Sequence, residues 1–445
     1  MNYYLGIDLG STTTKAVILD ENGAIVGRGI TNSRCSYDVA CQVALTEALI
    51  NTRFWIVASE LGRAGIDQKR TRSLLAELER RFRQQQYVAQ LRTLGKVLHE
   101  LLDKQGLGAG VRASVERILE RTEREAAKLF GEGAKRKSDF FRDLAGSPYL
   151  HLAEHEAAGG GPSFDLLVGL FDKAILEVEN TPSEAGSFQR HAFATLEAMD
   201  DPVPEFREAV DRAVRVELHQ VSGVGTGYGR LRLPFSKDRI RSEILCHGLG
   251  AHAIFPLTRT VLDIGGQDTK AIQVDEQGIV TSFQMNDRCA AGCGRYLGYS
   301  ADEMNLGVPE IGLIAARSKH PVCINSTCTV FAGTEVRERL SLGQRREDIL
   351  AGLHRAIILK AMSLLARSGG VRNEFTFTGG VAKNPAAVDA LLNLVAENYG
   401  RMKLNLSADS IYTGALGAAL FALRGPERCQ PLRPVLDPQK ADVVT

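Results

Sequence analysis

Two glycine turns carry residue types that bind phosphate groups. One turn lies in the segment Asp8–Lys15 and the other lies in Asp263–Lys270. Glycine lets a ligand approach the backbone closely, and successive N–H groups and hydroxyls then converge on an anion. The residues expected to hold nucleotide phosphates are Gly10, Ser11, Thr12, Thr13, Thr14, Lys15, Gly265, Gly266 and Lys270.

Acidic side chains flank both turns. Asp8 and Asp263 each lie near the end of an apolar run, and Asp268 follows the second turn. Magnesium prefers oxygen ligands, so these carboxylates are expected to hold a hydrated Mg2+ ion or a water molecule. Gln267 is expected to orient the attacking water, a role that glutamine has in other nucleotide hydrolases. The predicted catalytic residues are therefore Gln267, Asp8, Asp263 and Asp268.

A third glycine pair lies in the segment Phe377–Asn384, between a predicted strand and a predicted helix. Such a pair lets the backbone lie flat beside an adenine ring. The residues expected to contact adenosine are Gly379, Gly380, Val381 and Asn384. A single glycine turn is usually only a hairpin, but these three in this order indicate an ATP site. The sequence has no Walker A segment and no GxGxxG, so P-loop and dinucleotide folds lose their main support.

Cysteine is the other residue type that indicates chemistry. The eight cysteines are Cys35, Cys41, Cys246, Cys289, Cys293, Cys323, Cys328 and Cys429. Eight are too few for a disulfide scaffold in a chain of 445 residues. In a reducing compartment such residues are buried fillers, reactive thiols or metal ligands. Those without a ligand-like context, which are expected to be structural, are Cys35, Cys41, Cys246 and Cys429.

The composition excludes several classes of protein. Lys and Arg number 54 and Asp and Glu 53, and this balance provides no overall field for binding nucleic acid or an anionic membrane. The longest uncharged apolar run, around 414–423, is shorter than the roughly 18 residues of a membrane-spanning helix. Asp8 interrupts the first apolar run, so a signal peptide is not expected. The predicted location is the cytoplasm, with no nucleic acid or membrane as partner.

The elements that position these turns repeat along the chain. Residues 3–30 are expected to form a three-strand meander, with its second turn at Asn22-Gly23. Residues 260–274 show the same pattern, with the second turn at 276–278. The two copies predict an α/β fold built from two related halves.

Between the copies, residues 34–217 have a different character. Apolar side chains recur at helical spacing over 71–105 and 111–130, which predicts a mostly helical insertion. Residues 51–150 hold 20 Lys and Arg against 13 Asp and Glu, whereas 151–210 hold 3 against 12. These charge blocks indicate solvated helix faces, and a docking surface is the sharper alternative.

The remaining elements complete the predicted organisation. Helices are expected at 238–253, 292–304, 333–341, 347–368, 385–398 and 413–423, and strands at 221–230, 374–378 and 403–406. The predicted domains are a first ATPase half (1–33 and 218–259), the insertion (34–217), a second half (260–425) and a C-terminal tail (426–445).

This order of motifs resembles that of the actin, Hsp70 and sugar-kinase ATPase fold, which is ribonuclease H-like. Two further segments, Asn286–Tyr296 and Asn325–Ala332, narrow the resemblance to one redox branch. This branch is the BadF/BadG/BcrA/BcrD ATPase family, which includes 2-hydroxyacyl-CoA dehydratase activators and the ATPase subunits of benzoyl-CoA reductase. The resemblance covers about 1–32 and 218–425 and omits the insertion.

The resemblance implies a 4Fe-4S cluster that is shared between two subunits. Each subunit contributes one cysteine from each motif, which here are Cys289 and Cys328, 39 residues apart. Thiolates are the usual ligands of such a cluster, and two per chain require a partner chain. A helix that begins at 290–292 would stabilise the anionic cluster. From the sequence alone, Cys293 and Cys323 leave open a complete site within one chain, although the family pattern does not include them.

Within this branch, the insertion resembles that of the larger ATPase subunit of ATP-dependent benzoyl-CoA reductase. That resemblance implies ATP, Mg2+ and the shared cluster as cofactors. It also implies a smaller homologous ATPase subunit, two catalytic substrate-reducing subunits and ferredoxin as partners. ATP hydrolysis would then drive low-potential electrons toward aromatic ring reduction. The alternatives are an activator of a 2-hydroxyacyl-CoA dehydratase, a metal-free kinase of the same fold, and a non-catalytic assembly scaffold.

Overall fold

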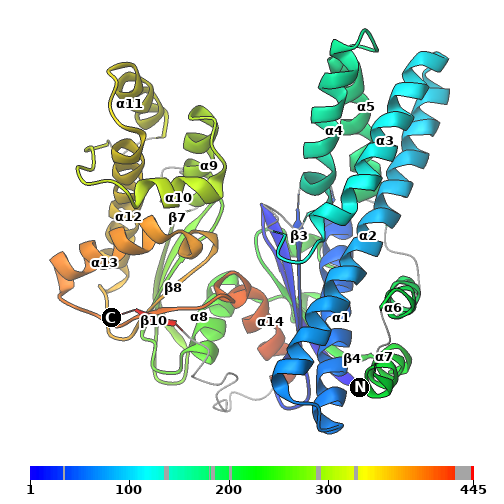
Figure 1. The fold of residues 1–445 in the computed structure, drawn as a ribbon. Helices are drawn as coiled ribbons and strands as arrows, with labels where there is room; N and C mark the ends of the chain where they lie inside the picture. The colour runs from blue at the N-terminus through cyan, green and yellow to red at the C-terminus, as the bar shows by residue number, and fades with distance from the viewer. Residues whose placement is uncertain are drawn as a thin grey trace. The chain divides into compact units, whose positions relative to one another are not determined.

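The computed structural model describes residues 1–33, 36–134, 140–179, 181, 186–199, 203–286, 292–324, 329–425 and 442–444 (Figure 1). The chain divides into two compact units. The helical unit consists of Met1 and Gly29–Leu218, and the sheet unit consists of Asn2–Arg28 and His219–Thr445.

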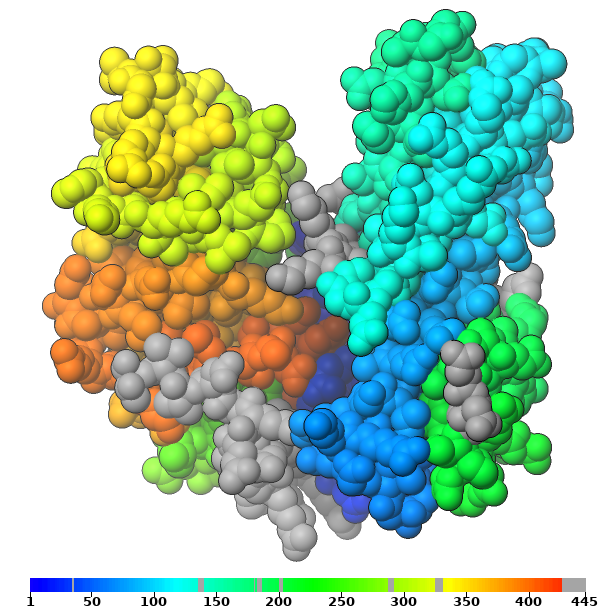
Figure 2. Space-filling model, in the orientation of Figure 1, coloured from blue at the N-terminus to red at the C-terminus, as the bar shows by residue number. Residues whose placement is uncertain are grey.

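Long helices build the helical unit. They are α1 (Tyr37–Arg63), α2 (Gln68–Lys104), α3 (Ala109–Leu129), α4 (Phe141–Ala158), α5 (Phe164–Glu179), α6 (Ser187–Glu197) and α7 (Pro204–Arg215). Helices α2 to α5 run side by side (Figure 1), and the side chains of α2 and α3 form the region that runs from blue to cyan in Figure 2. The predicted helical character of 71–105 and 111–130 is confirmed by α2 and α3.

Apolar side chains at helical spacing hold these helices together. Leu94, Leu98 and Leu102 of α2 lie on one face because they are four residues apart. They share a buried cluster with Ile118 of α3 and Ile175 of α5. Burial of one such side chain stabilises the fold by about 1.5–3 kcal/mol, so this seam provides much of the stability of the unit.

The first sheet has the strand order β3-β2-β1-β4, and its edge strand β3 spans the boundary between the two units at Gly29. Its strands are β1 (Asn2–Leu9), β2 (Thr13–Leu19), β3 (Ile25–Asn32) and β4 (His219–Thr226). β1 pairs antiparallel with β2 and parallel with β4. The turn before β3 is tight because Gly23 has a φ of 81° and the Asp20 carboxylate accepts hydrogen bonds from the N–H groups of Asn22 and Ala24. The predicted meander is confirmed.

The second sheet has the strand order β10-β9-β8-β5-β6-β7. Its strands are β5 (Thr260–Ile264), β6 (Thr269–Val274), β7 (Val280–Asn286), β8 (Phe375–Thr378), β9 (Leu404–Leu406) and β10 (Asp442–Val444). β5, β6 and β7 form an antiparallel meander, and β5 pairs parallel with β8. The second predicted hairpin is therefore confirmed, and the duplicated α/β architecture with it. Of the predicted C-terminal tail, the structure describes only β10, which pairs with β9.

The helices of the sheet unit pack against these sheets. They are α8 (Glu243–Ile254), α9 (Gly294–Glu303), α10 (Val308–Ala315), α11 (Thr329–Ser341), α12 (Arg346–Ser368), α13 (Pro385–Tyr399) and α14 (Thr413–Arg424). Helix α8 begins at Glu243, later than predicted, because 237–239 form a separate 3-10 turn. Helix α10 was not predicted, since a run of eight residues that begins with Val308-Pro309 gives little periodic signal.

Helix α12 is long and apolar enough to cross a membrane by length and composition alone. Within the described residues, 67% of its most apolar window is buried inside the protein. Ile349, Leu353 and Ile357 belong to the largest apolar cluster of the sheet unit, together with Phe375 and Phe377 of β8. The apolar face of α12 is therefore a core-packing face.

Helices α8 and α14 cross at very short range beside β1. A Cβ atom at Gly250 would lie 2.0 Å from the Thr413 carbonyl oxygen, and one at Gly417 would lie 1.9 Å from that of Cys246. A Cβ atom at Gly6 of β1 would likewise meet the Ala415 carbonyl oxygen at 2.0 Å. Only glycine allows this packing, which brings the start of each helix close to the end of β1.

Candidate nucleotide and cation site

Each hairpin of the sheet unit places an aspartate, a lysine and a threonine side by side. In the first sheet, Asp8 pairs in register with Lys15 on β2 and with Thr226 on β4. In the second sheet, Asp263 pairs in the same way with Lys270 on β6 and with Thr378 on β8. The duplication therefore extends from the backbone to the chemistry of the strand ends.

The two predicted phosphate turns face each other. A Cβ atom at Gly266 would lie 2.6 Å from the Thr12 hydroxyl oxygen, so the turns approach within contact distance. A Cβ atom at Gly10 would meet the Thr13 carbonyl oxygen at 2.7 Å. Ser11 is half-buried, whereas Thr12 and Gln267 are exposed at the turn tips. The glycines thus allow the two turns to pack closely, and their contact with phosphate stays a prediction.

Lys270 is buried and is surrounded by carboxylates. Its Nζ lies 2.9 Å from Glu243 Oε1, 2.9 Å from Asp268 Oδ1 and 3.3 Å from Asp263 Oδ2. Burial disfavours the ammonium, but the three carboxylates outweigh burial and raise the pKa of Lys270 well above its ordinary value. The structure therefore uses the Lys270 charge inside the protein, where the sequence predicted a contact to phosphate.

The Asp263 carboxylate is paired with Thr378, His247 and Lys270. Thr378 donates a hydrogen bond of 2.7 Å to Oδ1, and His247 Nδ1 lies 3.3 Å from the same oxygen. Burial works against ionisation, yet His247 and Lys270 hold the pKa of Asp263 far below its usual range. Burial raises the pKa of Asp268, although Lys270 opposes the shift.

Asp8 has fewer partners. Its residue exposure is 3%, and Lys15 Nζ lies 3.6 Å from Oδ2. Among the residues that the structure describes, Oδ1 has no hydrogen-bond partner. A buried carboxylate oxygen without a partner is unfavourable, so this atom points to a missing ligand.

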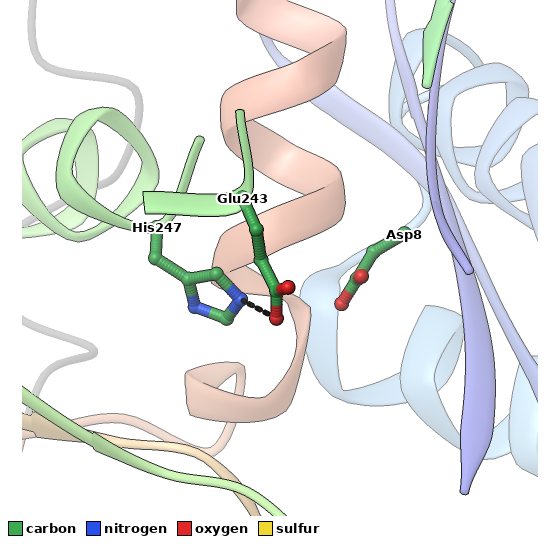
Figure 3. A group of neighbouring side chains, drawn as sticks. All are labelled: Asp8, Glu243 and His247. Atoms are coloured by element: carbon green, nitrogen blue, oxygen red, sulfur yellow. Dashed lines mark ion pairs between the residues drawn. The ribbon is translucent and has the colours of Figure 1, made fainter. Parts of the chain in front are cut away.

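Glu243 and His247 join Asp8 from helix α8 (Figure 3). One ligand atom from each of the three side chains lies within 4.8 Å of the others. His247 Nε2 is 3.8 Å from Glu243 Oε1, and Thr413 Oγ1 is 3.2 Å from His247 Nδ1. Burial opposes a charge on His247, but the Asp263 carboxylate outweighs it and raises the pKa. Neither Glu243 nor His247 was predicted from the sequence, although their spacing of four places them on one helix face.

These donors fit a divalent cation. Two carboxylates and an imidazole are common metal ligands, and the orphaned Asp8 oxygen is available. Glycines replace side chains around them: a Cβ atom at Gly227 would lie 2.6 Å from Asp8 Oδ1, and one at Gly414 would lie 2.9 Å from Asp8 Oδ2. The site thus has both the ligands and the cleared space that an ion needs.

The predicted adenosine segment begins with a backbone feature that requires glycine. Gly379 has a φ of 85°, and a Cβ atom there would meet the Ile264 carbonyl oxygen at 2.3 Å. A Cβ atom at Gly380 would meet nothing within 4 Å, and Val381 is buried. The segment therefore presents an open backbone at Gly380 next to the end of β5, and its contact with an adenine ring stays a prediction.

Asn384 has an internal role in this structure. Its Oδ1 accepts hydrogen bonds from the N–H groups of Ala386 and Ala387, which caps helix α13. Its Nδ2 lies 2.9 Å from Nε2 of the buried His354. Both ends of the amide are thus occupied by protein groups, where the sequence predicted a contact to adenosine.

The predicted cluster ligands, Cys289 and Cys328, lie outside the described residues. Of their neighbours, Cys293 is buried at the N-cap of α9, and Cys323 is exposed. Helix α9 begins at Gly294, and the predicted start at 290–292 lies mostly in the part that is not described. Cys41 and Cys246 are buried, as expected of structural cysteines, while Cys35 and Cys429 are not described.

The start of α9 is tied to the second phosphate turn. The N–H groups of Gly294 and Arg295 donate to the carbonyl oxygens of Gly265 and Gly266, at 2.8 Å and 2.7 Å. The Thr269 hydroxyl also donates to the Gly292 carbonyl oxygen. The second phosphate turn and the start of α9 are therefore joined directly by hydrogen bonds.

Comparisons with known proteins identify the family to which this combination of turns belongs. Residues 5–422 match the model of the BadF/BadG/BcrA/BcrD ATPase family. This chain belongs to that family. The resemblance inferred from the motifs is thereby confirmed, and so is the fold of the actin, Hsp70 and sugar-kinase type.

Relatives in the BadF/BadG/BcrA/BcrD ATPase family differ in their partners. The (R)-2-hydroxyglutaryl-CoA dehydratase activating ATPase of Acidaminococcus fermentans is 41% identical over 223 residues, which cover 50% of this chain and 83% of that protein. A benzoyl-CoA reductase subunit of Thauera aromatica is 34% identical over 179 residues, which cover 39% of this chain and 62% of that protein.

A solved structure has a similar fold. The crystal structure of (R)-2-hydroxyglutaryl-CoA dehydratase component A from Acidaminococcus fermentans aligns with a TM-score of 0.50 and 25% identity, covering 95% of this chain and 98% of that chain. Similarity in sequence is therefore greater to an activating ATPase than to the benzoyl-CoA reductase subunit, which the insertion alone had favoured.

Proposed function

We propose that this chain is an ATP-driven activator of a partner enzyme of the 2-hydroxyacyl-CoA dehydratase type. The 41% identity to an activating ATPase over most of that protein supports this choice. Benzoyl-CoA reductase, which the insertion favoured in the sequence analysis, becomes the second candidate because the match to its subunit is weaker and shorter.

The observation that carries the proposal is the connection between the second phosphate turn and α9. Backbone hydrogen bonds join Gly265 and Gly266 to Gly294 and Arg295. Loss of a γ-phosphate changes the contacts of a phosphate-binding turn, and such changes move attached segments. ATP turnover at the turn would therefore displace the polypeptide that leads to Cys289, which is what an activator requires.

Residues of both turns would bind ATP and position the water that attacks it. The backbone of Gly10, the hydroxyls of Ser11–Thr13 and the backbone of Gly265–Gly266 would hold the phosphates, whereas Thr14 is buried. The ammonium of Lys15 would add positive charge. The exposed Gln267 would orient the attacking water. Gly379 and Gly380 would lie beside the adenine ring. The bound Mg2+ would neutralise phosphate charge.

A 4Fe-4S cluster is part of this proposal on the strength of the two cysteine motifs. Cys289 and Cys328 would supply two of the four thiolates that such a cluster needs. When bound, the cluster accepts and donates single electrons at low potential. Two thiolates per chain require a second subunit, and a second copy of this chain is proposed, as is a cytoplasmic location that keeps the thiols reduced.

An activity assay under anaerobic conditions tests the function. The purified chain, an electron donor and ATP are added to the catalytic subunits of a 2-hydroxyacyl-CoA dehydratase or, separately, to those of a benzoyl-CoA reductase. ATP-dependent turnover with the dehydratase subunits alone is the expected result. Turnover with the reductase subunits alone would replace the proposal by the second candidate.

The cluster assignment has its own test. Cys289→Ala and Cys328→Ala are expected to lose the brown absorbance and the iron of the anaerobically purified protein. The exposed Cys323 offers a matched control, and Cys323→Ala should keep both. Full iron content in Cys289→Ala or Cys328→Ala would refute that ligand assignment, and a wild-type protein without iron would support a kinase.

A further inference from the structure

The equivalent aspartates of the two hairpins differ in how well they are satisfied. Asp263 receives a hydroxyl, an imidazole and an ammonium, at 2.7, 3.3 and 3.3 Å. Asp8 has an ammonium at 3.6 Å from one oxygen, while Asp8 Oδ1 has no partner among the described residues. Since both carboxylates are buried, Asp8 is the one that lacks a ligand.

Additional donors lie beside Asp8 and come from one face of α8. Ligand atoms of Asp8, Glu243 and His247 are all within 4.8 Å of one another, and the side chains point toward a common centre in Figure 3. Gly414 keeps this centre clear, since its Cβ atom would lie 2.8 Å from His247 Nε2 and 2.9 Å from Asp8 Oδ2. The packing of α8 and α14 beside β1 thus brings these donors together.

The charges of the cluster call for a cation. The acidic groups are Asp8, Glu243, Asp263 and Asp268, and the ammonium groups are Lys15 and Lys270. Four carboxylates against two ammonium groups leave an acidic surplus around the His247 imidazole. A bound cation would offset this surplus, because buried like charges are costly without compensation.

Asp263 and Asp268 are poor candidates for the ion, although the sequence predicted them. Lys270 Nζ lies 3.3 Å from Asp263 and 2.9 Å from Asp268, so this ammonium occupies the place beside both carboxylates. Thr378 takes a further lone pair of Asp263. An ion that approached these oxygens would have to displace a buried positive charge.

We propose that Asp8, Glu243 and His247 bind a divalent transition-metal ion directly, without nucleotide, and in preference to Mg2+. The imidazole nitrogen gives this preference because Mg2+ selects oxygen ligands, whereas first-row transition ions accept nitrogen. This inference rests on the proposed ATP-dependent function, for which the same site would place the ion beside the phosphate turns. It replaces Asp263 and Asp268 as ion ligands by Glu243 and His247.

Mn2+ binding to the full chain without nucleotide tests the site, because bound Mn2+ is visible by electron paramagnetic resonance. Pulsed measurements are expected to detect one directly coordinated nitrogen. Labelling the wild-type protein with 15N-histidine should convert the 14N modulation to that of 15N. This readout needs no substitution, so a misfolded variant cannot mislead it.

Two variants then identify the histidine. His247→Gln is expected to lose the nitrogen coupling and to bind Mn2+ at least tenfold more weakly. His252 lies on the same helix, where its Nε2 contacts the Glu276 carbonyl oxygen at 3.1 Å, so His252→Gln should retain both properties. Glu243→Gln should weaken Mn2+ binding while the nitrogen coupling remains.

Three results would overturn the inference: no Mn2+ binding without ATP, bound Mn2+ without nitrogen coupling, or coupling that persists in His247→Gln. None of these results depends on the activity of a partner enzyme. Failure of the dehydratase assay would refute the proposed function and leave the Mn2+ spectra unchanged, so the two proposals fail separately.

Discussion

In the second hairpin of the sheet unit, Asp263 lies in a closed set of partners that includes Lys270, Thr378 and His247. In the first hairpin, Asp8 has the equivalent strand partners, but Thr226 turns its hydroxyl to the Arg241 carbonyl oxygen and leaves Asp8 Oδ1 without a bond within the described part of the chain. The same backbone duplication therefore yields one internally neutralised aspartate and one that is open to a ligand.

The physical reason for the difference is the cost of a buried charge. An ionised group inside a protein persists only when charges or hydrogen bonds compensate for lost water. Around Asp263 the protein itself supplies that compensation, which makes this half a structural support. Around Asp8 part of the compensation is missing, as is typical of sites that bind an ion or substrate.

The largest expected effect comes from removing the buried ammonium. Lys270→Met leaves Asp263, Asp268 and Glu243 without their shared positive charge, and we expect unfolding free energy to fall by about 3–5 kcal/mol. Hydrogen exchange of β5 and β6 amides measures the loss within the sheet unit. A loss below about 1 kcal/mol would show that the second hairpin is not internally neutralised.

The next largest effect is a difference in stability loss between substitutions of the two equivalent threonines. Thr378→Val removes a hydrogen bond to a buried carboxylate, which is worth about 1.5–3 kcal/mol. Thr226→Val removes a bond to a neutral carbonyl and is expected to cost about 0.5–1.5 kcal/mol. Urea unfolding of both variants provides the comparison. Equal losses would contradict the distinction between the hairpins.

Lys15→Met should have a smaller effect on stability than Lys270→Met. The Lys15 side chain is 17% exposed and its distance to Asp8 is 3.6 Å, so the pair is long and partly hydrated. We expect a loss of about 1 kcal/mol in unfolding free energy. ATP hydrolysis should fall at least tenfold in the same variant, because this ammonium remains available to a phosphate. Unchanged ATP hydrolysis would remove Lys15 from the site.

Asp8→Asn should have the smallest effect on stability without metal. Neutralising a carboxylate that is only partly compensated is expected to change unfolding free energy by less than about 1 kcal/mol. Added Mn2+ at about a hundredfold excess over Kd should stabilise the wild type by about 2.7 kcal/mol and leave Asp8→Asn unaffected. Thermal unfolding with and without Mn2+ measures this difference, and equal shifts in both proteins would place the ion elsewhere.

Much of the fold follows from local patterns in the sequence. The turn at Asn22-Gly23 and the runs on either side of it predict a meander because turn residues and alternation act over a few positions. The leucines of α2 predict a helix for the same reason. Helix α10 was not predicted because eight residues span only about two helical turns and give little periodic signal. The start of α8 was predicted too early because 237–239 form a separate turn.

The candidate site was likewise predicted only in part from the sequence. Glycine spacing in Asp8–Lys15 and Asp263–Lys270 marked the two turns that the fold brings together. The partners of each side chain did not follow from spacing. Asn384 became a helix cap with His354 as neighbour, because an N-cap position and a packed helix meet there only in the folded chain.

The sequence alone determined the family, the duplicated hairpins, the glycine turns and the cysteine motifs, because each depends on residues that are close in the chain. Only the tertiary structure decided which charges neutralise one another. Glu243 and His247 lie more than 230 residues from Asp8, yet the close crossing of α8, α14 and β1 brings their ligand atoms within 4.8 Å. Long-range packing sets the distances between charges, and those distances determine which aspartate remains open to a ligand.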